Sequence, residues 1–188
     1  MPASSGTRHL RLFTAIGLPA RVAELLVESA RKQLPARPSR IRPTSADNTH
    51  ITLSFLGAVE ATRLETIRQA LAKIVSPPFR VTLNGLGRFA HAEVFLAKVE
   101  SSPGLLALAE QVAASLEACG FPREKRPYQP HLTLARGKGL AFPLPMTNDP
   151  AFHQSFDATE FRLYESVTHP EGVQYEVLSV HPLHGPAH

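Results

Sequence analysis

Two short stretches of this chain repeat one pattern, HITL at residues 50–53 and HLTL at residues 131–134. Each stretch reads histidine, apolar residue, threonine, apolar residue. Side chains at positions i and i+2 of a β-strand point to the same face, so each histidine shares a face with its threonine while the apolar residues point into a core. The pattern predicts two strands that each offer an imidazole and a hydroxyl, and the duplication predicts one site built from both.

A single copy of this pattern carries little information. A histidine beside a strand more often just hydrogen-bonds a backbone carbonyl, and threonine is common in strands because of its β-propensity. For a chain of this composition, chance gives roughly 0.1 matches, and two matches occur in roughly one such chain in two hundred. The second copy therefore favours a functional interpretation over a structural one.

The chain has 188 residues with 43% apolar and 19% charged side chains, which is typical of a folded globular protein. We expect one domain over residues 1–188, with flexible ends at residues 1–9 and 184–188. The single cysteine, Cys119, excludes a disulfide within the chain and a thiolate zinc cluster. It favours a reducing compartment. No stretch is apolar enough to span a bilayer, so we expect a cytoplasmic protein with no membrane partner and no obligate protein partner.

The charge balance favours a phosphate ligand without establishing one. The formal net charge is +4, and the cationic side chains are fifteen arginines and five lysines. The planar guanidinium group of arginine matches the geometry of phosphate oxygens. A solvated basic surface explains the same numbers equally well.

The order of predicted elements indicates an α+β protein. Apolar periodicity, glycines and prolines predict strands at 10–16, 50–57, 79–86, 93–99, 131–134, 156–164 and 175–180, helices at 20–34, 59–76 and 105–119, and a loop at 35–48. A helix and a loop rich in arginine and proline precede each motif strand. We therefore expect a duplicated, pseudo-symmetric architecture with helices outside and the motif strands facing each other across a groove.

Two imidazoles and two hydroxyls suit displacement at phosphorus. The ordinary pKa of histidine, near 6.5, allows one neutral imidazole to act as a base while a charged one acts as an acid. Threonine hydroxyls and a nearby arginine would hold the non-bridging oxygens. A cyclic phosphate is a natural substrate, because ring opening releases an alkoxide that needs a proton. A metal site is the main rival, but neither motif histidine has a carboxylate beside it, and Asp47 would face away from His50.

The sequence resembles the 2H phosphoesterase superfamily, which paired His-x-Thr-x motifs define. Within it, the chain is similar to the bacterial RNA 2′,3′-cyclic phosphodiesterases, also called 2′-5′ RNA ligases. The similar segments are RLFTAIGLP from Arg11, ADNTHITLSFLG from Ala46, RPYQPHLTLAR from Arg126, and the terminal pair FRLYES and GVQYEVL. The resemblance extends from residue 11 to residue 183.

This resemblance implies two pseudo-symmetric lobes, each an antiparallel sheet with helices outside, around a central cleft. It implies that His50 donates a proton to the leaving 3′ oxygen and that His131 accepts one from water, leaving a 2′-phosphate end. Thr52 and Thr133 would bind the phosphate. The implied partners are RNA ends or nucleoside cyclic phosphates, with weak reverse 2′-5′ joining of RNA and with no metal and no organic cofactor.

Three further residues are candidates for the site. The resemblance makes Arg136 a phosphate ligand, although strict alternation would turn it to the core face unless the strand bulges or ends there. Phe13 and Tyr128 are candidates to stack a base, with a core role equally open. Many relatives carry a tryptophan before the first motif, where this chain has residues 41–43, Ile-Arg-Pro, and no tryptophan at all.

Two alternatives stay open at this point. In the first, the substrate is another cyclic phosphate or a 2′-5′ linked nucleotide, because the motifs recognise phosphate and not the rest of the molecule. In the second, the protein binds RNA ends without catalysis. A binder predicts salt-sensitive binding that survives the loss of both histidines, with no product formed.

Overall fold

The strands form one antiparallel sheet in the order β7-β4-β5-β6-β3-β1-β8-β9, with the short β2 paired to β6. The structure is a computed structural model and describes residues 8–34, 41–89, 92–138 and 148–185. The strands are β1 (His9–Gly17), β2 (Ile41–Pro43), β3 (His50–Glu60), β4 (Phe79–Phe89), β5 (Val94–Val99), β6 (His131–Gly137), β7 (Ser155–Ala158), β8 (Glu160–His169) and β9 (Gly172–Pro182). The helices are α1 (Ala20–Gln33), α2 (Leu64–Leu71) and α3 (Pro103–Ala118), with 3-10 turns at Ala61–Arg63 and Pro150–Phe152.

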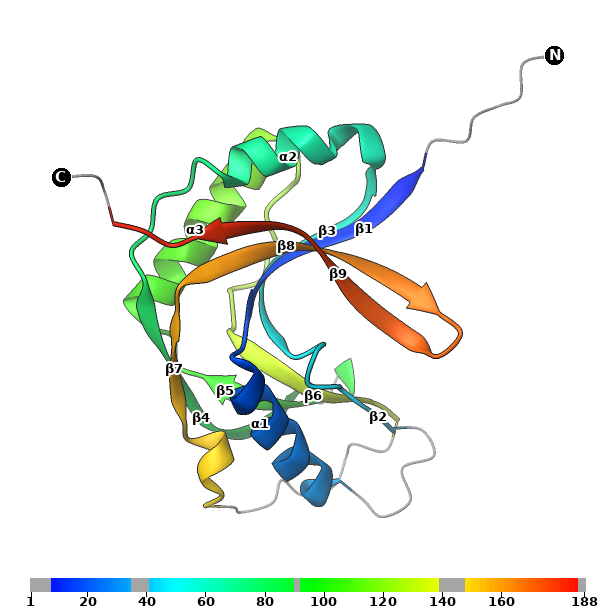
Figure 1. Cartoon of the computed structure of the whole chain (residues 1–188), viewed down its shortest axis with the longest axis vertical. Coiled ribbons are helices and arrows are strands. Elements are labelled where there is room, and N and C mark those ends of the chain that lie inside the picture. Colours follow the sequence, from blue (N-terminus) through cyan, green and yellow to red (C-terminus); the bar gives the residue numbers. More distant parts are fainter. Residues whose placement is uncertain (1–7, 35–40, 90–91, 139–147, 186–188) are drawn as a thin grey trace.

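The two motif strands meet at the centre of this sheet. β3 and β6 are joined through the antiparallel pair Ile51 and Leu132. On one side of the junction lie β5, β4 and β7, and on the other lie β1, β8 and β9. The sheet curls, and the β8–β9 hairpin extends away from the helices (Figure 1). The predicted α+β architecture with two antiparallel halves is confirmed, and the halves belong to one continuous sheet.

The apolar residues of the motifs point into the main core. Ile51 and Leu132 have no exposed surface and share one cluster with Leu26 of α1, Ile67 of α2 and Leu108 of α3. Full burial of such a side chain contributes about 1.5–3 kcal/mol. The opposite strand face carries the histidines and threonines, as the alternation predicts, so the packed helices hold both motifs in place from behind.

β3 is longer than predicted and the helix after it is shorter. The pattern predicts a helix over 59–76, whereas β3 runs to Glu60 and α2 occupies only residues 64–71. The reason is pairing along the whole of β1, which reaches His9 opposite Glu60. Continuous ladder hydrogen bonds outweigh the weak helical preference of the first residues after the motif.

The sequence pattern missed the division between β7 and β8, and it missed β2. The predicted strand over 156–164 is two strands, because β7 pairs with β4 while β8 pairs with β1 across the sheet. The predicted loop over 35–48 contains β2, which pairs with the end of β6. Both cases depend on partners distant in sequence, which local periodicity does not report.

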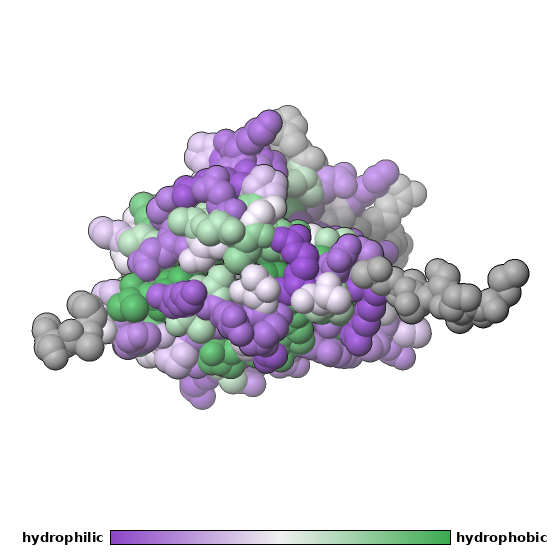
Figure 2. All heavy atoms as spheres, turned by 90° about the horizontal axis from the view of Figure 1, so that it is seen from above, coloured by the Kyte–Doolittle hydropathy of each residue, from purple (hydrophilic) through white to green (hydrophobic). Residues whose placement is uncertain are grey.

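The ends of the chain are described only in part. β1 already begins at His9, within the segment expected to be flexible. Residues 1–7 and 186–188 lie outside the described residues, and a single domain with flexible ends stays a prediction. None of the described helices is long and apolar enough to cross a membrane. Seen from above, the surface alternates between hydrophilic and smaller hydrophobic areas (Figure 2).

We predict that Leu132→Ala lowers the free energy of unfolding by about 2–5 kcal/mol, because it leaves a cavity at the junction of the two halves. The matched control is Leu106→Ala on α3, where the leucine is 41% exposed. Its effect should stay within about 0.5 kcal/mol. Urea unfolding of both variants measures the difference, and equal losses would contradict the central position of the Leu132 side chain.

Candidate active site

The two motif histidines make the same backbone contact. Nδ1 of His50 lies 2.8 Å from the carbonyl oxygen of Asn48, and Nδ1 of His131 lies 2.8 Å from the carbonyl oxygen of Gln129. A carbonyl only accepts, so each contact places the proton on Nδ1 and leaves Nε2 available for proton transfer. In both copies the partner is the residue two positions earlier. The carbonyl contact that is common for structural histidines is present in both copies, and it fixes the orientation of each ring.

The strand register brings the two motifs together. Ile51 lies opposite Leu132 in an antiparallel pair. Continuing that register by one residue in each direction places His50 opposite Thr133 and His131 opposite Thr52, on the face away from the core. By this register, each motif histidine is expected opposite the threonine of the other motif. One pseudo-twofold arrangement contains all four predicted residues.

A β-bulge brings Arg136 to the same group. Leu96 pairs with Thr133 and Phe95 with Ala135, so β6 carries one extra residue between these two pairs. Nη2 of Arg136 donates to Oγ1 of Thr133 at 3.3 Å. The sequence left two possibilities for this arginine, and the bulge turns it to the site.

Tyr128 ties the loop before β6 to β3. Its hydroxyl donates to the backbone carbonyl of Thr52 at 3.0 Å, and its ring is partly buried against the main core. Burial raises the pKa of the Tyr128 phenol well above its ordinary value, so the group stays a neutral donor. The contact fixes the backbone of one motif from the segment that leads into the other. Tyr128 thus has a positioning contact that the base-stacking prediction did not include.

Phe13 is not available as a base platform. Only 3% of its surface is exposed. Its ring stacks on Tyr164 with centroids 5.1 Å apart, and the rings of His50 and Tyr175 each lie 4.9 Å away. Stacking a base requires an open ring face, and the Phe13 ring is almost fully buried among these three neighbours. Phe13 instead supports the imidazole of His50 from within the sheet.

The electrostatics of the site make both imidazoles neutral in the free protein. Burial lowers the pKa of His50 to about 4, against a raising contribution from the Asn48 carbonyl, and the charges of Arg136 and His131 lower it further. Burial also lowers the pKa of His131, again with Arg136 contributing. Near pH 7 the lowered pKa values therefore favour two neutral imidazoles, in place of the expected pair of one neutral and one charged imidazole. An anion bound between the rings would raise both values.

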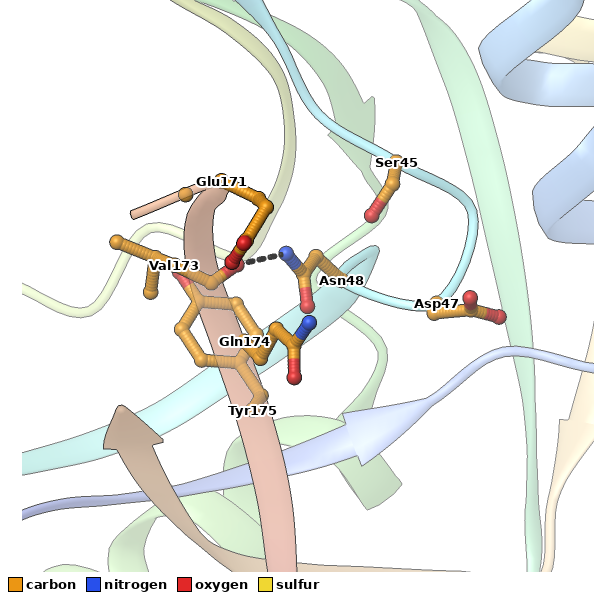
Figure 3. Close-up of a pocket in the computed structure, with 8 residues that line it drawn as sticks. Ser45, Asp47, Asn48, Glu171, Val173, Gln174 and Tyr175 are labelled. Carbon is orange, nitrogen blue, oxygen red and sulfur yellow. Dashed lines mark hydrogen bonds between the residues drawn. The ribbon is translucent and has the colours of Figure 1, made fainter. Parts of the chain in front are cut away.

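A pocket of about 440 Å³ is lined in part by Tyr175, whose ring contacts His50 (Figure 3). It is formed by the loop before β3 and the start of β9, with the lining residues Ser45, Asp47, Asn48, Glu171, Gly172, Val173, Gln174 and Tyr175. Nδ2 of Asn48 donates to the carbonyl of Val173 at 2.7 Å and closes one wall. The ring of Tyr175 meets the ring of His50 edge-on at 5.1 Å.

Sequence reasoning missed several neighbours of the histidines. Tyr175 was seen only as the start of a strand, and Phe89 lies beyond the predicted end of its strand. The ring of Phe89 meets His131 edge-on with centroids 4.8 Å apart. Lys98 of β5 pairs directly with His131 in the sheet and is exposed. No local signal marks these residues, because their position depends on the register of strands that are distant in sequence.

No metal-ligating cluster accompanies the site in the described ranges. There, no group of three or more histidine, cysteine, aspartate or glutamate side chains lies close enough to hold a metal ion. The donors that surround the motif are hydroxyls, imidazoles and a guanidinium. These groups recognise an anion through hydrogen bonds and charge.

Comparison with known proteins defines the class. The family model described as the 2′-5′ RNA ligase superfamily matches residues 18–169, which is most of the chain and includes both motifs. The chain belongs to this superfamily of 2H phosphoesterases. The resemblance given by the paired motifs is thereby confirmed.

Individual relatives narrow the comparison. The chain is 35% identical over 157 residues to an RNA 2′,3′-cyclic phosphodiesterase of Escherichia coli, covering 83% of this chain and 86% of that protein. It is 34% identical over 188 residues to an RNA 2′,3′-cyclic phosphodiesterase of Thermus thermophilus, and this alignment covers 94% of this chain and 91% of that protein. The fold also matches a crystal structure of E. coli LigT complexed with 3′-AMP, with a TM-score of 0.81 and 32% sequence identity. The match covers 94% of this chain and 99% of that chain.

The lowered pKa of His50 predicts an acid-sensitive fold. Between the ordinary pKa of 6.5 and the folded value of about 4, the unfolded chain binds more protons than the folded one, so stability falls as pH falls. Near pH 4.5 this single group costs about 2–3 kcal/mol relative to neutral pH. His50→Gln should lose that part of the pH dependence.

Urea unfolding of wild type and His50→Gln at neutral pH and near pH 4.5 measures this contribution. His184→Gln is the matched control, because that histidine is exposed on the C-terminal segment. An identical pH dependence in wild type and His50→Gln would show that the His50 imidazole is not held neutral by burial.

Proposed function

We propose that this protein hydrolyses the 2′,3′-cyclic phosphate ends of RNA to 2′-phosphate ends. The observation that carries the proposal is the matched pair of histidines, each with Nδ1 bound to a backbone carbonyl and Nε2 left for proton transfer. Arg136 and Thr133 add an anion-binding pair beside them. The relatives in E. coli and T. thermophilus are named for this substrate.

The reaction follows from the arrangement of these groups. The cyclic phosphate lies between the two imidazoles, and its non-bridging oxygens accept hydrogen bonds from Thr52, Thr133 and Arg136. Nε2 of His131 takes a proton from water as the water oxygen attacks phosphorus. The bond from phosphorus to O3′ breaks, and Nε2 of His50 gives its proton to O3′. The products are a 2′-phosphate and a free 3′-hydroxyl, and at the end His131 carries the additional proton while His50 is neutral.

The assignment of the acid and the base rests on the family resemblance, because the two histidine environments are alike in geometry. They differ in burial. The more strongly lowered pKa of His50 makes it the stronger acid of the pair once it is protonated. That order agrees with a proton donated to the leaving alkoxide by His50.

The same groups support 2′-5′ ligation, in which a hydroxyl takes the place of water. If the 5′-hydroxyl of a second RNA replaces water, His131 takes its proton, and a 2′-phosphate ester to the 5′ oxygen forms as the cyclic phosphate opens. The family description as 2′-5′ RNA ligases favours this second activity. Water at bulk concentration favours hydrolysis, so we propose that ligation is weak.

Loss of either histidine should slow turnover strongly. We expect His50→Ala and His131→Ala each to lower the rate on a nucleoside 2′,3′-cyclic phosphate in EDTA by about 10²–10⁴-fold, the usual contribution of acid–base catalysis. His184→Ala is the control and should keep the wild-type rate. Chromatography that separates 2′- from 3′-phosphates identifies the product.

Three outcomes would contradict the proposal. Full activity in either motif variant would remove the histidines from the mechanism. A faster wild-type turnover of 3′,5′-cyclic or 2′-5′ linked nucleotides would assign a different substrate. Salt-sensitive RNA binding that persists in both variants, without any product, would identify a binding protein.

The pH profile should reflect two histidines whose pKa values are lowered in the free protein. Catalysis needs one protonated and one neutral imidazole, so kcat/KM should be greatest between about 4 and 6.5 and should fall at higher pH as the acid loses its proton. Bound phosphate raises both pKa values, so the maximum of kcat should lie at higher pH. Steady-state kinetics across this range tests the expectation, and a maximum of kcat/KM above neutral pH would refute it.

A further inference from the structure

Phe55 is an exposed aromatic side chain beside the candidate site. It lies on β3, three residues after Thr52, and 70% of its surface is exposed. Among the large apolar side chains that are exposed in the described part of the chain, Phe55 is the most exposed, and its ring contact is with Phe13. Neither the acid–base mechanism nor the phosphate contacts use it.

A bulge in β3 places Phe55 on the same face as Thr52. Ala15 of β1 pairs with Thr52, and Phe13 pairs with Phe55, so β3 has one extra residue in this interval. Simple alternation would put residues 52 and 55 on opposite faces. The centroid of the Phe55 ring lies 6.1 Å from that of Phe13, which itself contacts the His50 ring.

Arg11 continues this face away from the motifs. It is exposed between the buried Leu10 and Leu12 of β1, and it lies two residues from Phe13, so its side chain is on the face of Phe13 and Phe55. β1 and β3 are neighbours along their whole length (Figure 1). The distance along the strand from Thr52 to Phe55 is about 10 Å. The Phe55 ring and the Arg11 guanidinium therefore lie one after the other on the same face of the β1–β3 pair, at increasing distance from the motif histidines.

We propose that Phe55 and Arg11 bind the RNA strand that precedes the cyclic phosphate, with a base stacked on the Phe55 ring and a backbone phosphate at the Arg11 guanidinium. This site rests on the proposed function, because it extends the substrate from the reacting nucleotide into the chain. Aromatic platforms beside cationic groups bind single strands without reading sequence, since every base has a stacking face. The site therefore selects RNA ends over free mononucleotides, with little base preference.

The alternative occupant of Phe55 is a second copy of this chain. An exposed aromatic residue also occurs at protein interfaces. The neighbouring Arg11 favours a polyanion, because two copies that meet here would bring like charges together. Self-association of the chain through Phe55 would overturn this assignment.

The test compares a nucleoside 2′,3′-cyclic phosphate with a five-nucleotide RNA that ends in the same cyclic phosphate. Phe55→Ala should raise KM for the RNA by roughly 5- to 150-fold, the loss expected for one stacked base, and leave the mononucleotide unchanged. Phe55→Trp should restore the RNA value, because a larger ring stacks as well. Leu106→Ala, which removes an exposed apolar side chain from α3, is the matched control and should change neither substrate.

Arg11→Gln tests the electrostatic part. It should weaken RNA binding and reduce the slope of log affinity against log salt by roughly 0.7, the value for one phosphate contact to a single strand. Lys73→Gln, an exposed cation after α2, is the matched control and should keep the wild-type slope.

The outcomes separate this site from the proposed function. Wild-type protein that turns over neither substrate would refute the function, and fluorescence anisotropy of a five-nucleotide RNA with a 2′-phosphate end would then decide the Phe55 site alone. Equal changes for both substrates, no change for the RNA, or a wild-type dimer that dissociates in Phe55→Ala would each overturn the strand-binding site.

Discussion

The site depends on the meeting of two strands at one backbone pair, Ile51 with Leu132. That pair joins the two halves of the sheet and sets the register in which each histidine lies beside the threonine of the other motif. Both residues are fully buried against the helices, so the junction is held by core packing on one side. This packing fixes the positions of the histidines and threonines on the opposite face of the two strands.

Around the junction, polar contacts orient the motif side chains whose strands the core holds in place. The carbonyls of Asn48 and Gln129 fix the two imidazoles, and the Tyr128 hydroxyl holds the Thr52 backbone. Each of these partners comes from the loop that leads into one of the motifs. The segments before the motif strands are therefore part of the catalytic apparatus, although they are irregular in structure and carry no reacting group.

Most of the site could be predicted from the sequence, because alternation fixes which residues share a strand face and duplication indicates that two strands cooperate. Alternation fails where a strand bulges. Arg136 and Phe55 both reach the site face through an extra residue in their strands, and neither bulge has a local signal such as glycine. The sequence left both a core role and a base-stacking role open for Phe13, because its burial depends on Tyr164 and Tyr175, from strands about 150 residues later in the chain.

The neutral resting state of the two histidines has a consequence for product release. Under the proposed reaction, the substrate carries one negative charge and the 2′-phosphate product carries up to two. Because an anion raises the pKa of each imidazole, the product holds protons on the pair more firmly than the substrate does. Under the proposed reaction, departure of the product should therefore be accompanied by proton loss to solvent, and acid conditions should prolong occupancy by the product.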